Sequence, residues 1–190
     1  MSRANAVFVD VDGTVVKTFG ARPTNSLDEV ELLSGVIEGF QRIDKLGLRT
    51  IAVSNQGGVG LGFITNEFVL AKHKRINELL LHAGSKKIDS FYYCADSPFI
   101  RCECRKPRPG MLLQAAKDLE IDLSTSYMVG DGLPDMAAGV NAGISHRILV
   151  LGGWEQASPA ETHTARDMVH VAGVIAKIEA GLTPVREVTG

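Results

Sequence analysis

The sequence has few cysteines, no long apolar run and no block of like charges, and each shortage excludes a class of protein. Three cysteines, all between residues 94 and 104, do not suit the framework of a disulfide-rich secreted domain and favour reduced thiols or a metal cluster. No stretch approaches the ~18 apolar residues of a membrane span, and no signal-peptide pattern opens the chain. The net charge of -2 gives no general attraction for nucleic acid. We therefore expect a cytoplasmic protein without a membrane or nucleic-acid partner.

The composition and the lack of an internal linker predict a single domain over residues 1–190. Hydrophobic residues make up 45% of the chain and charged residues 22%, as in ordinary globular proteins. Short β-rich runs alternate with segments of helical apolar spacing, which predicts an α/β fold with a doubly wound parallel sheet. The expected strands are residues 6–11, 48–53, 88–94, 126–129 and 147–151, and the expected helices are residues 30–46, 65–83, 109–119, 136–142 and 169–180.

The organising feature is a buried strand that ends in two carboxylates. Residues 6–11 are apolar on successive positions, as in a strand covered on both faces, and Asp10 and Asp12 leave its carboxyl end. Ligands bind at that end of open α/β sheets, and alternate strand residues point the same way, so both acids can share one site. Because close carboxylates repel each other, the pair indicates a metal ion, or a nucleophile beside an acid/base. The alternative is an ordinary acidic turn, since Gly13 and Thr14 follow.

Polar side chains also gather after other predicted strands and in the loop before the third predicted helix. In chain order they are Ser54, Asn55, Gln56, Arg105, Lys106, Asp131 and Asp135. The glycine-rich stretch at residues 57–62 matches neither a P-loop nor a dinucleotide-binding spacing, so we interpret its glycines as backbone freedom for a tight loop. Taken alone, Arg105 and Lys106 are typical of a solvated basic loop. Asp131 is then interpreted as a helix N-cap, and Asp135 as an acid in the first turn of that helix.

Taken together and in this order, these pieces resemble the four motifs of the haloacid dehalogenase-like (HAD) phosphohydrolases. The similarity is strongest to the small, capless bacterial branch that contains heptose bisphosphate phosphatase and histidinol-phosphatase, and it extends over nearly the whole chain. The resemblance implies a capless Rossmannoid fold and a Mg²⁺-dependent phosphatase of a small sugar phosphate. The matching pieces are Asp10-Val11-Asp12-Gly13-Thr14, Ser54-Asn55-Gln56, residues 102–111 (Cys-Glu-Cys-Arg-Lys-Pro-Arg-Pro-Gly-Met) and Met128-Val129-Gly130-Asp131.

The resemblance and the residue types together indicate catalytic roles. Asp10 is expected to attack phosphorus and form an aspartyl-phosphate. Asp12 is expected to protonate the leaving alkoxide and then to take a proton from the hydrolytic water. Ser54 and Lys106 are expected to bind the phosphoryl oxygens, with the lysine stabilising the charge that develops in the transition state.

The same resemblance implies a magnesium site and substrate contacts. Asp10, the backbone carbonyl of Asp12 and Asp131 are expected to hold Mg²⁺, with Asp135 in support, because this hard ion prefers carboxylate and carbonyl oxygens. Arg105 is expected to orient the substrate by a bidentate contact. The other expected substrate-binding residues are Thr14, Asn55 and Gln56.

The segment at residues 94–104 resembles the zinc loop of this branch. The branch has a histidine ligand where this sequence has Asp96, and zinc also accepts carboxylate oxygen. We therefore expect Asp96 to replace the histidine in a structural zinc site that fixes the loop carrying Arg105 and Lys106. The alternative is free thiols. Two histidines of the second predicted helix, His73 and His82, are interpreted as surface residues. The expected zinc ligands are Cys94, Asp96, Cys102 and Cys104.

Three departures from the branch pattern bear on the substrate. Val11, Leu61 and Gly132 stand where the branch usually carries two arginines and a lysine, so three positive charges are absent. The resemblance favours D-glycero-D-manno-heptose 1,7-bisphosphate, with its 7-phosphate removed. Histidinol phosphate or another small monoester, a polynucleotide 3'-end and a non-catalytic binding module are the alternatives, and a monomer or small homo-oligomer is expected. Candidates to replace the missing charge are Arg22, Arg101 and Arg108.

Overall fold

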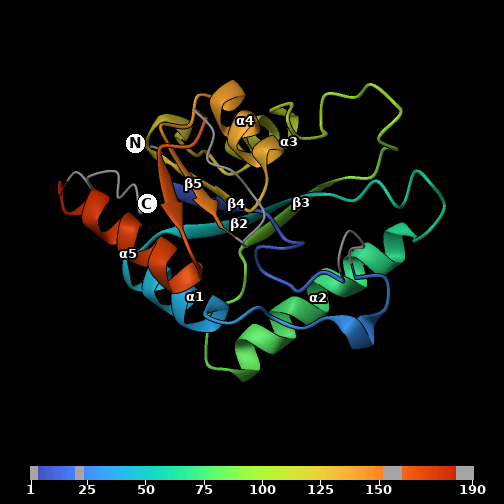
Figure 1. Cartoon of the computed structure of the whole chain (residues 1–190), viewed down its shortest axis with the longest axis horizontal. Helices are drawn as coiled ribbons and strands as arrows, with labels where there is room; N and C mark the ends of the chain where they lie inside the picture. The colour runs from blue at the N-terminus through green and yellow to red at the C-terminus, as the bar shows by residue number, and fades with distance from the viewer. Residues whose placement is uncertain (1–3, 20–23, 152–159, 183–190) are drawn as a thin grey trace.

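Parallel strands form one sheet in the computed structural model, which describes residues 4–19, 24–151 and 160–182 (Figure 1). The strand order is β3-β2-β1-β4-β5-β6, and each neighbouring pair runs parallel. This arrangement confirms the predicted doubly wound α/β fold, because the chain moves outward from β1 in both directions. The strands are β1 (Ala6–Val9), β2 (Arg49–Asn55), β3 (Ser90–Cys94), β4 (Tyr127–Gly130), β5 (His146–Val150) and β6 (His163–Ala165).

Helices cover both faces of the sheet. Helices α1, α2 and α5 lie on one face, and α3 and α4 lie on the other (Figure 1). None of the helices in the described ranges is long and apolar enough to cross a membrane. The helices are α1 (Val36–Lys45), α2 (Asn66–His82), α3 (Gly110–Asp118), α4 (Leu133–Ala142) and α5 (Met168–Glu179), with short 3-10 helices η1 (Leu27–Glu29) and η2 (Leu123–Thr125).

β1 lies at the centre of the core. Val7 and Val9 pack on the side of α1, α2 and α5, whereas Ala6 and Phe8 pack on the side of α3 and α4. All four side chains are fully buried. Burying one valine or phenylalanine side chain stabilises a fold by about 1.5–3 kcal/mol. The strand that leads to Asp10 is therefore held firmly in the middle of the sheet.

The segment between β1 and α1 differs from the prediction. The helix expected over residues 30–46 begins only at Val36, because Gly35 before it has a left-handed φ of 80°. In the preceding segment the Leu33 amide donates to the Val15 carbonyl at 3.0 Å. These residues therefore anchor the loop that follows β1 instead of extending the helix.

Two other elements differ less from the prediction. The sequence pattern does not predict β6, which has only three residues. Helix α4 begins at Leu133 rather than residue 136, because Pro134 is accommodated in its first turn. The described segments that follow β1 and β2 carry no inserted domain, as predicted for a capless fold.

The sequence pattern places His73 on the surface, but the structure buries it. Its exposed fraction is 5%, and its ring stacks on Phe91 with the ring centroids 4.1 Å apart. Burial lowers the pKa of His73 from 6.5 to about 4, and the positive charge of Lys72 adds to the effect. His82, the last residue of α2, is exposed as predicted.

We expect His73 to make the protein less stable in acid. Its pKa is 6.5 in the unfolded chain and about 4 in the fold, so the unfolded state binds more protons between these pH values. As the pH falls through this window, His73 should lower the free energy of unfolding by roughly 2–3 kcal/mol. The His73→Phe variant should lose this part of the pH dependence. Urea unfolding of both proteins at neutral and acid pH measures the difference, and an equal acid loss in both would contradict the prediction.

Candidate active site

The strand order brings the predicted polar residues to one edge of the sheet. Because β1 lies between β2 and β4, Asp10, Ser54 and Asp131 meet at the carboxyl ends of three neighbouring strands. The Asp10 amide donates to the Val129 carbonyl at 2.9 Å, which fixes the Asp10 backbone against β4. Ser54 lies inside β2 rather than after it, and it is 1% exposed.

Lys106 joins two carboxylates of this edge. Its ammonium lies 2.5 Å from Asp10 Oδ1 and 2.6 Å from Asp135 Oδ1, and it donates to the Val53 carbonyl at 2.7 Å. The lysine side chain is only 3% exposed, so these charge-assisted contacts are made away from water. Asp135 also accepts from the Gly132 amide at 3.1 Å through its other oxygen. It is therefore both the first-turn acid that its position predicts and a partner of Lys106.

The charges of this cluster do not balance. Burial raises the pKa of Asp10 from 3.8 to about 7, although the adjacent Lys106 lowers it, and burial likewise raises the pKa of Asp135. Burial would lower the pKa of Lys106, but the two carboxylates outweigh burial and raise that pKa, so the ammonium stays charged. One ammonium between two buried carboxylates leaves excess negative charge, which a divalent cation would neutralise.

Three carboxylates of the cluster could hold such a cation. Oxygens of Asp10, Asp131 and Asp135 lie within 4.8 Å of one another, and Mg²⁺ prefers this type of donor. Gly13 has φ +94° and leaves no room for a Cβ beside the Asp131 carboxylate. Thr14 Oγ1 donates to Asp131 Oδ1 at 3.1 Å and orients that side chain. The donor set therefore fits the predicted magnesium.

Among the described residues, the Asp12 carboxylate contacts Gln56 and Lys72, and Lys72 lies outside the four motifs. Gln56 Nε2 donates to Asp12 Oδ2 at 2.8 Å and to Ser54 Oγ at 2.7 Å. Lys72 Nζ lies 2.5 Å from Asp12 Oδ1. Lys72 belongs to α2, 60 residues along the chain, and its side chain is fully buried. Helix α2 thus contributes a charge to the site.

A sequence signal for Lys72 exists, although the motifs do not contain it. The lysine lies three residues after Val69 and four before Ile76, which are both fully buried. It therefore occupies the apolar face of α2, where lysine is rarely buried unless it is paired. Its position alone indicates a buried partner, but the sequence does not identify Asp12 as that partner.

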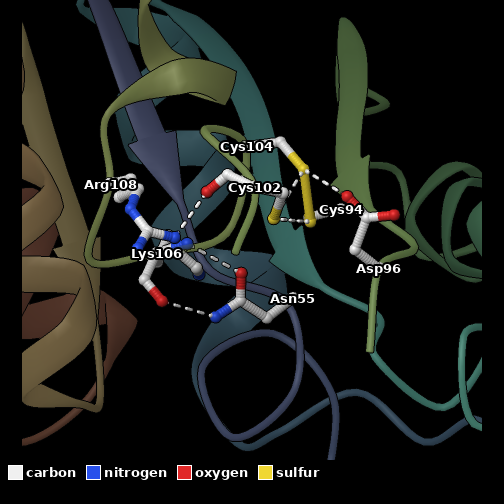
Figure 2. Close-up of a disulfide and its surroundings, with 7 residues drawn as sticks. All are labelled: Asn55, Cys94, Asp96, Cys102, Cys104, Lys106 and Arg108. Carbon is white, nitrogen blue, oxygen red and sulfur yellow. Dashed lines mark hydrogen bonds between the residues drawn. A yellow bond between two sulfur atoms is a disulfide. The ribbon is translucent and has the colours of Figure 1, made fainter. Parts of the chain in front are cut away.

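Asn55 holds the backbone of Lys106. Its Nδ2 donates to the Lys106 carbonyl at 3.1 Å, and its Oδ1 accepts from the Lys106 amide at 3.0 Å (Figure 2). These two bonds position the start of the Lys106 side chain. The protein contacts of Thr14, Asn55 and Gln56 orient other site residues, and the direct substrate contacts expected of them stay a prediction.

Arg105 lines a cavity beside Lys106. The cavity has a volume of about 440 Å³, and Arg101 and Arg108 also line it. Arg105 Nη1 is buried and has no hydrogen-bond partner within the described part of the chain. An unpaired guanidinium N–H of this kind favours an anionic ligand. Arg22, the other candidate for supplying charge, lies outside the described residues.

The cysteine loop brings three sulfurs and one carboxylate together (Figure 2). Cys94 and Cys104 are joined as a disulfide with their Cα atoms 5.5 Å apart, and Cys102 Sγ lies 3.4 Å from each of the two sulfurs. Asp96 Oδ2 lies 3.6 Å from Cys104 Sγ, and the four possible ligand atoms lie within 4.8 Å of one another. The loop therefore brings the Cys102 and Cys104 sulfurs back to the Cys94 sulfur at the end of β3, and whether these residues bind zinc stays a prediction.

The cysteine loop is connected directly to the active-site loop. Arg108 Nη1 donates to the Cys102 carbonyl at 2.6 Å, and Lys106 follows Cys104 by two residues (Figure 2). The positions of the cysteines therefore influence the positions of Lys106 and Arg108.

Known proteins share this sequence and architecture. The HAD-hydrolase-like family model matches residues 103–177. A D-glycero-beta-D-manno-heptose-1,7-bisphosphate 7-phosphatase of Yersinia pestis is 36% identical over 171 residues, which cover 86% of this chain and 88% of that protein. The Escherichia coli K12 protein of the same name is 37% identical over 158 residues, with coverage of 78% and 80%. The crystal structure of a D,D-heptose 1,7-bisphosphate phosphatase from B. bronchiseptica, complexed with magnesium and phosphate, has a TM-score of 0.81 at 25% identity and covers 92% of this chain and 99% of that chain.

Proposed function

Because this chain belongs to the haloacid dehalogenase-like family and is a phosphatase, we propose that it removes the 7-phosphate of D-glycero-D-manno-heptose 1,7-bisphosphate. The observation that carries the proposal is the cluster in which Lys106 joins Asp10 to Asp135, beside Asp131. The named activity of the two relatives, and the magnesium and phosphate in the related crystal structure, support the substrate class and the metal.

Asp10 is the nucleophile in this proposal. Its carboxylate oxygen attacks phosphorus, the bond from phosphorus to the substrate oxygen breaks, and the phosphoryl group is transferred to Asp10. Burial disfavours the ionised carboxylate, so the ammonium of Lys106 is needed to keep Asp10 reactive. Lys106 and Ser54 then bind the phosphoryl oxygens as charge shifts during transfer.

Asp12 exchanges protons in both halves of the reaction. Its protonated carboxyl gives a proton to the leaving alkoxide, which becomes the sugar hydroxyl. The resulting carboxylate takes a proton from the water that attacks phosphorus, and the bond between phosphorus and Asp10 breaks to release inorganic phosphate. The contact from Gln56 to Asp12 Oδ2 orients the carboxyl for these transfers.

Mg²⁺ would be held by Asp10, Asp131 and the backbone carbonyl of Asp12, with Asp135 in support. When bound, it supplies positive charge that lets an anionic nucleophile approach an anionic phosphate. The excess negative charge of the carboxylate cluster supports this assignment.

The arginine-lined cavity supports a substrate with a second phosphate. Val11 is buried in the core, and Gly132 carries no side chain, so neither supplies charge. Arg101, Arg105 and Arg108 line the cavity that adjoins Lys106 and could bind a phosphate at the far end of the sugar. These arginines would replace the charges that the motif positions lack.

A phosphate-release assay with Mg²⁺ tests the substrate. The panel contains both anomers of heptose 1,7-bisphosphate, heptose and hexose monophosphates, histidinol phosphate and a 3'-phosphorylated oligonucleotide. Preference for a heptose bisphosphate is expected. Activity confined to another ester would contradict the substrate, and no activity on any compound would contradict the proposed function.

Arg105→Met tests the role of the cavity with a matched control. The variant should raise KM for the bisphosphate by roughly 10-fold to 100-fold, because one charge-assisted contact is lost, and should change KM for a monophosphate little. Arg166→Met, at an arginine whose side chain is 85% exposed, should leave both values unchanged. An equal effect of Arg105→Met on both substrates would argue against a second phosphate in the cavity.

We also propose that the reduced cysteine loop holds a structural Zn²⁺. Sulfur ligands of tetrahedral zinc, at about 2.3 Å from the metal, lie roughly 3.8 Å from one another. Cys102 Sγ lies 3.4 Å from the sulfurs of Cys94 and Cys104, which is close to this spacing, and Asp96 supplies the fourth donor. Opening of the disulfide by a thiol reductant would free both thiolates for the metal.

Metal analysis of protein purified with reductant and without chelator should find about one zinc per chain. Asp96→Ala should weaken zinc retention, whereas Asp96→His, which supplies a common zinc ligand, should keep it. Chelation should lower the Tm of the reduced protein. Absence of zinc from the reduced protein would contradict this proposal and leave the phosphatase assignment unchanged.

The remaining expectations are also proposals. They are a single domain over residues 1–190, a monomer or small homo-oligomer, a cytoplasmic location, and no nucleic-acid or membrane partner. The near-neutral net charge of -2 supports the absence of a nucleic-acid partner. Light scattering of the purified protein and cell fractionation test these points.

A further inference from the structure

Each of the two proposed catalytic aspartates faces a buried lysine of its own. Lys106 Nζ lies 2.5 Å from Asp10 Oδ1, and Lys72 Nζ lies 2.5 Å from Asp12 Oδ1. Lys106 belongs to the loop before α3, whereas Lys72 belongs to α2 on the opposite side of the sheet. The second pair therefore connects the acid/base residue to an element that carries none of the four motifs.

The burial of Lys72 is difficult to explain by stability alone. Its side chain is fully buried between Val69 and Ile76, so the ammonium has lost its contact with water. A buried ion pair usually contributes no more net stability than well-packed hydrophobic residues of the same volume. Methionine, which has a similar length, would fill this space without a charge. The effect of the lysine on Asp12 is then the more direct reason for its presence.

The contacts of Lys72 and Gln56 together hold the Asp12 carboxyl in one orientation. Lys72 contacts Oδ1, Gln56 Nε2 donates to Oδ2 at 2.8 Å, and the Asp12 side chain is 15% exposed. A carboxyl that transfers protons must lie within hydrogen-bond reach of the leaving oxygen and of the attacking water. A displacement of about 1 Å can reduce a rate by about 10²-fold.

We propose that Lys72 is a positioning residue for the two proton transfers and acts through Asp12, an inference that rests on the proposed phosphatase mechanism. Lys72 holds the carboxyl where it protonates the leaving alkoxide as the bond between Asp10 and phosphorus forms. It holds the resulting carboxylate where this group accepts the proton of the water that releases Asp10. The lysine itself neither gives nor takes a proton in the cycle.

Two substrates that differ in their leaving group test the proposal. A sugar phosphate accepted by the wild-type protein releases an alkoxide that needs a proton, whereas p-nitrophenyl phosphate releases a stable phenolate that does not. In first-turnover measurements with Mg²⁺, Lys72→Met should slow release of the sugar by about 10²-fold and release of p-nitrophenolate by less than about threefold. Lys74→Met, at an exposed lysine of the same helix, should change neither rate.

A double variant separates positioning from a general structural role. In the Asp12→Asn background, Lys72→Met should cause no further loss, because residues that act as a unit have non-additive effects. Equal slowing of both substrates by Lys72→Met, or a full further loss in the Asp12→Asn background, would overturn the proposal. If Lys72→Met does not fold, Lys72→Gln takes its place in the test with two substrates. The double variant of Asp12→Asn and Lys72→Met leaves no charge of the pair buried alone, so it can still be compared with Asp12→Asn.

The outcomes distinguish this inference from the proposed function. If the wild-type protein releases product from no phosphate ester with Mg²⁺ present, the proposed function fails and the inference fails with it. If the wild-type protein is active and the folded Lys72→Met variant keeps full rates, only the role of Lys72 is overturned.

Discussion

Asp10→Asn is expected to lower the rate of phosphate release by ~10⁵-fold or more, because an amide cannot form the aspartyl-phosphate. The residual rate should equal that of a sample without added protein. Mass spectrometry of acid-quenched protein should detect a phosphorylated Asp10 in the wild type and no such species in the variant. Asp44→Asn, at a half-exposed aspartate that pairs with Lys86, is the matched control and should keep full activity.

The same substitution should leave the fold intact. Burial raises the pKa of Asp10 from 3.8 in the unfolded chain to about 7 in the fold, so between these pH values the folded state binds more protons. Stability contributed by this group is therefore lost as the pH rises through about 7, and ionised Asp10 destabilises the metal-free protein. Asp10→Asn removes that effect, so the Tm of the metal-free variant should equal or exceed the wild-type Tm. A Tm far below it would mean that lost activity reflects unfolding.

Lys106→Met should reduce both activity and stability. Activity should fall by about 10³-fold, because the charge that stabilises the transferring phosphoryl group is lost. The free energy of unfolding should fall by about 3–5 kcal/mol, because Asp10 and Asp135 are left buried without their shared cation. Urea unfolding and phosphate release, measured on the same preparations, check the two effects.

Two comparisons show whether the buried charges cause the effects of Lys106→Met. Adding Asp10→Asn to Lys106→Met should restore part of the lost stability, because one unpaired carboxylate is removed, but it should restore no activity. Lys86→Met, at a lysine whose side chain is 44% exposed, should change both properties little. A stable Lys106→Met protein would contradict the importance of the ion pairs in the fold.

The local sequence pattern predicted the central strand of the fold and the site residues that belong to the four motifs. The sequence of β1 is short and continuously apolar, which predicts a strand covered on both faces of the sheet. The structure buries all four of its residues. The carboxyl ends of adjacent parallel strands meet at one edge of a sheet, so the sequence predicts that Asp10 and Asp131 lie together. Helix α2 was predicted nearly to its ends, because Thr65 caps it and its apolar spacing is regular.

Patterns of this kind failed where contacts across the chain outweighed local preference. Apolar spacing extends the first helix back to residue 30, but pairing of Leu33 with Val15 takes the chain out of the helix. His73 reads as a polar surface residue, yet stacking on Phe91 in β3 accompanies its burial. The two hydrogen bonds from the Asn55 side chain to the backbone of Lys106 join residues 51 positions apart, and no local pattern predicts them.

The sequence by itself determined the strand-end carboxylates, their order and the basic loop, because these follow from residue type and strand periodicity. Only the tertiary structure decided which lysine serves which aspartate, with Lys106 placed on Asp10 and Lys72 on Asp12. These partners lie 96 and 60 residues apart, and an ion pair over such a separation depends on how the helices pack against the sheet rather than on any local pattern.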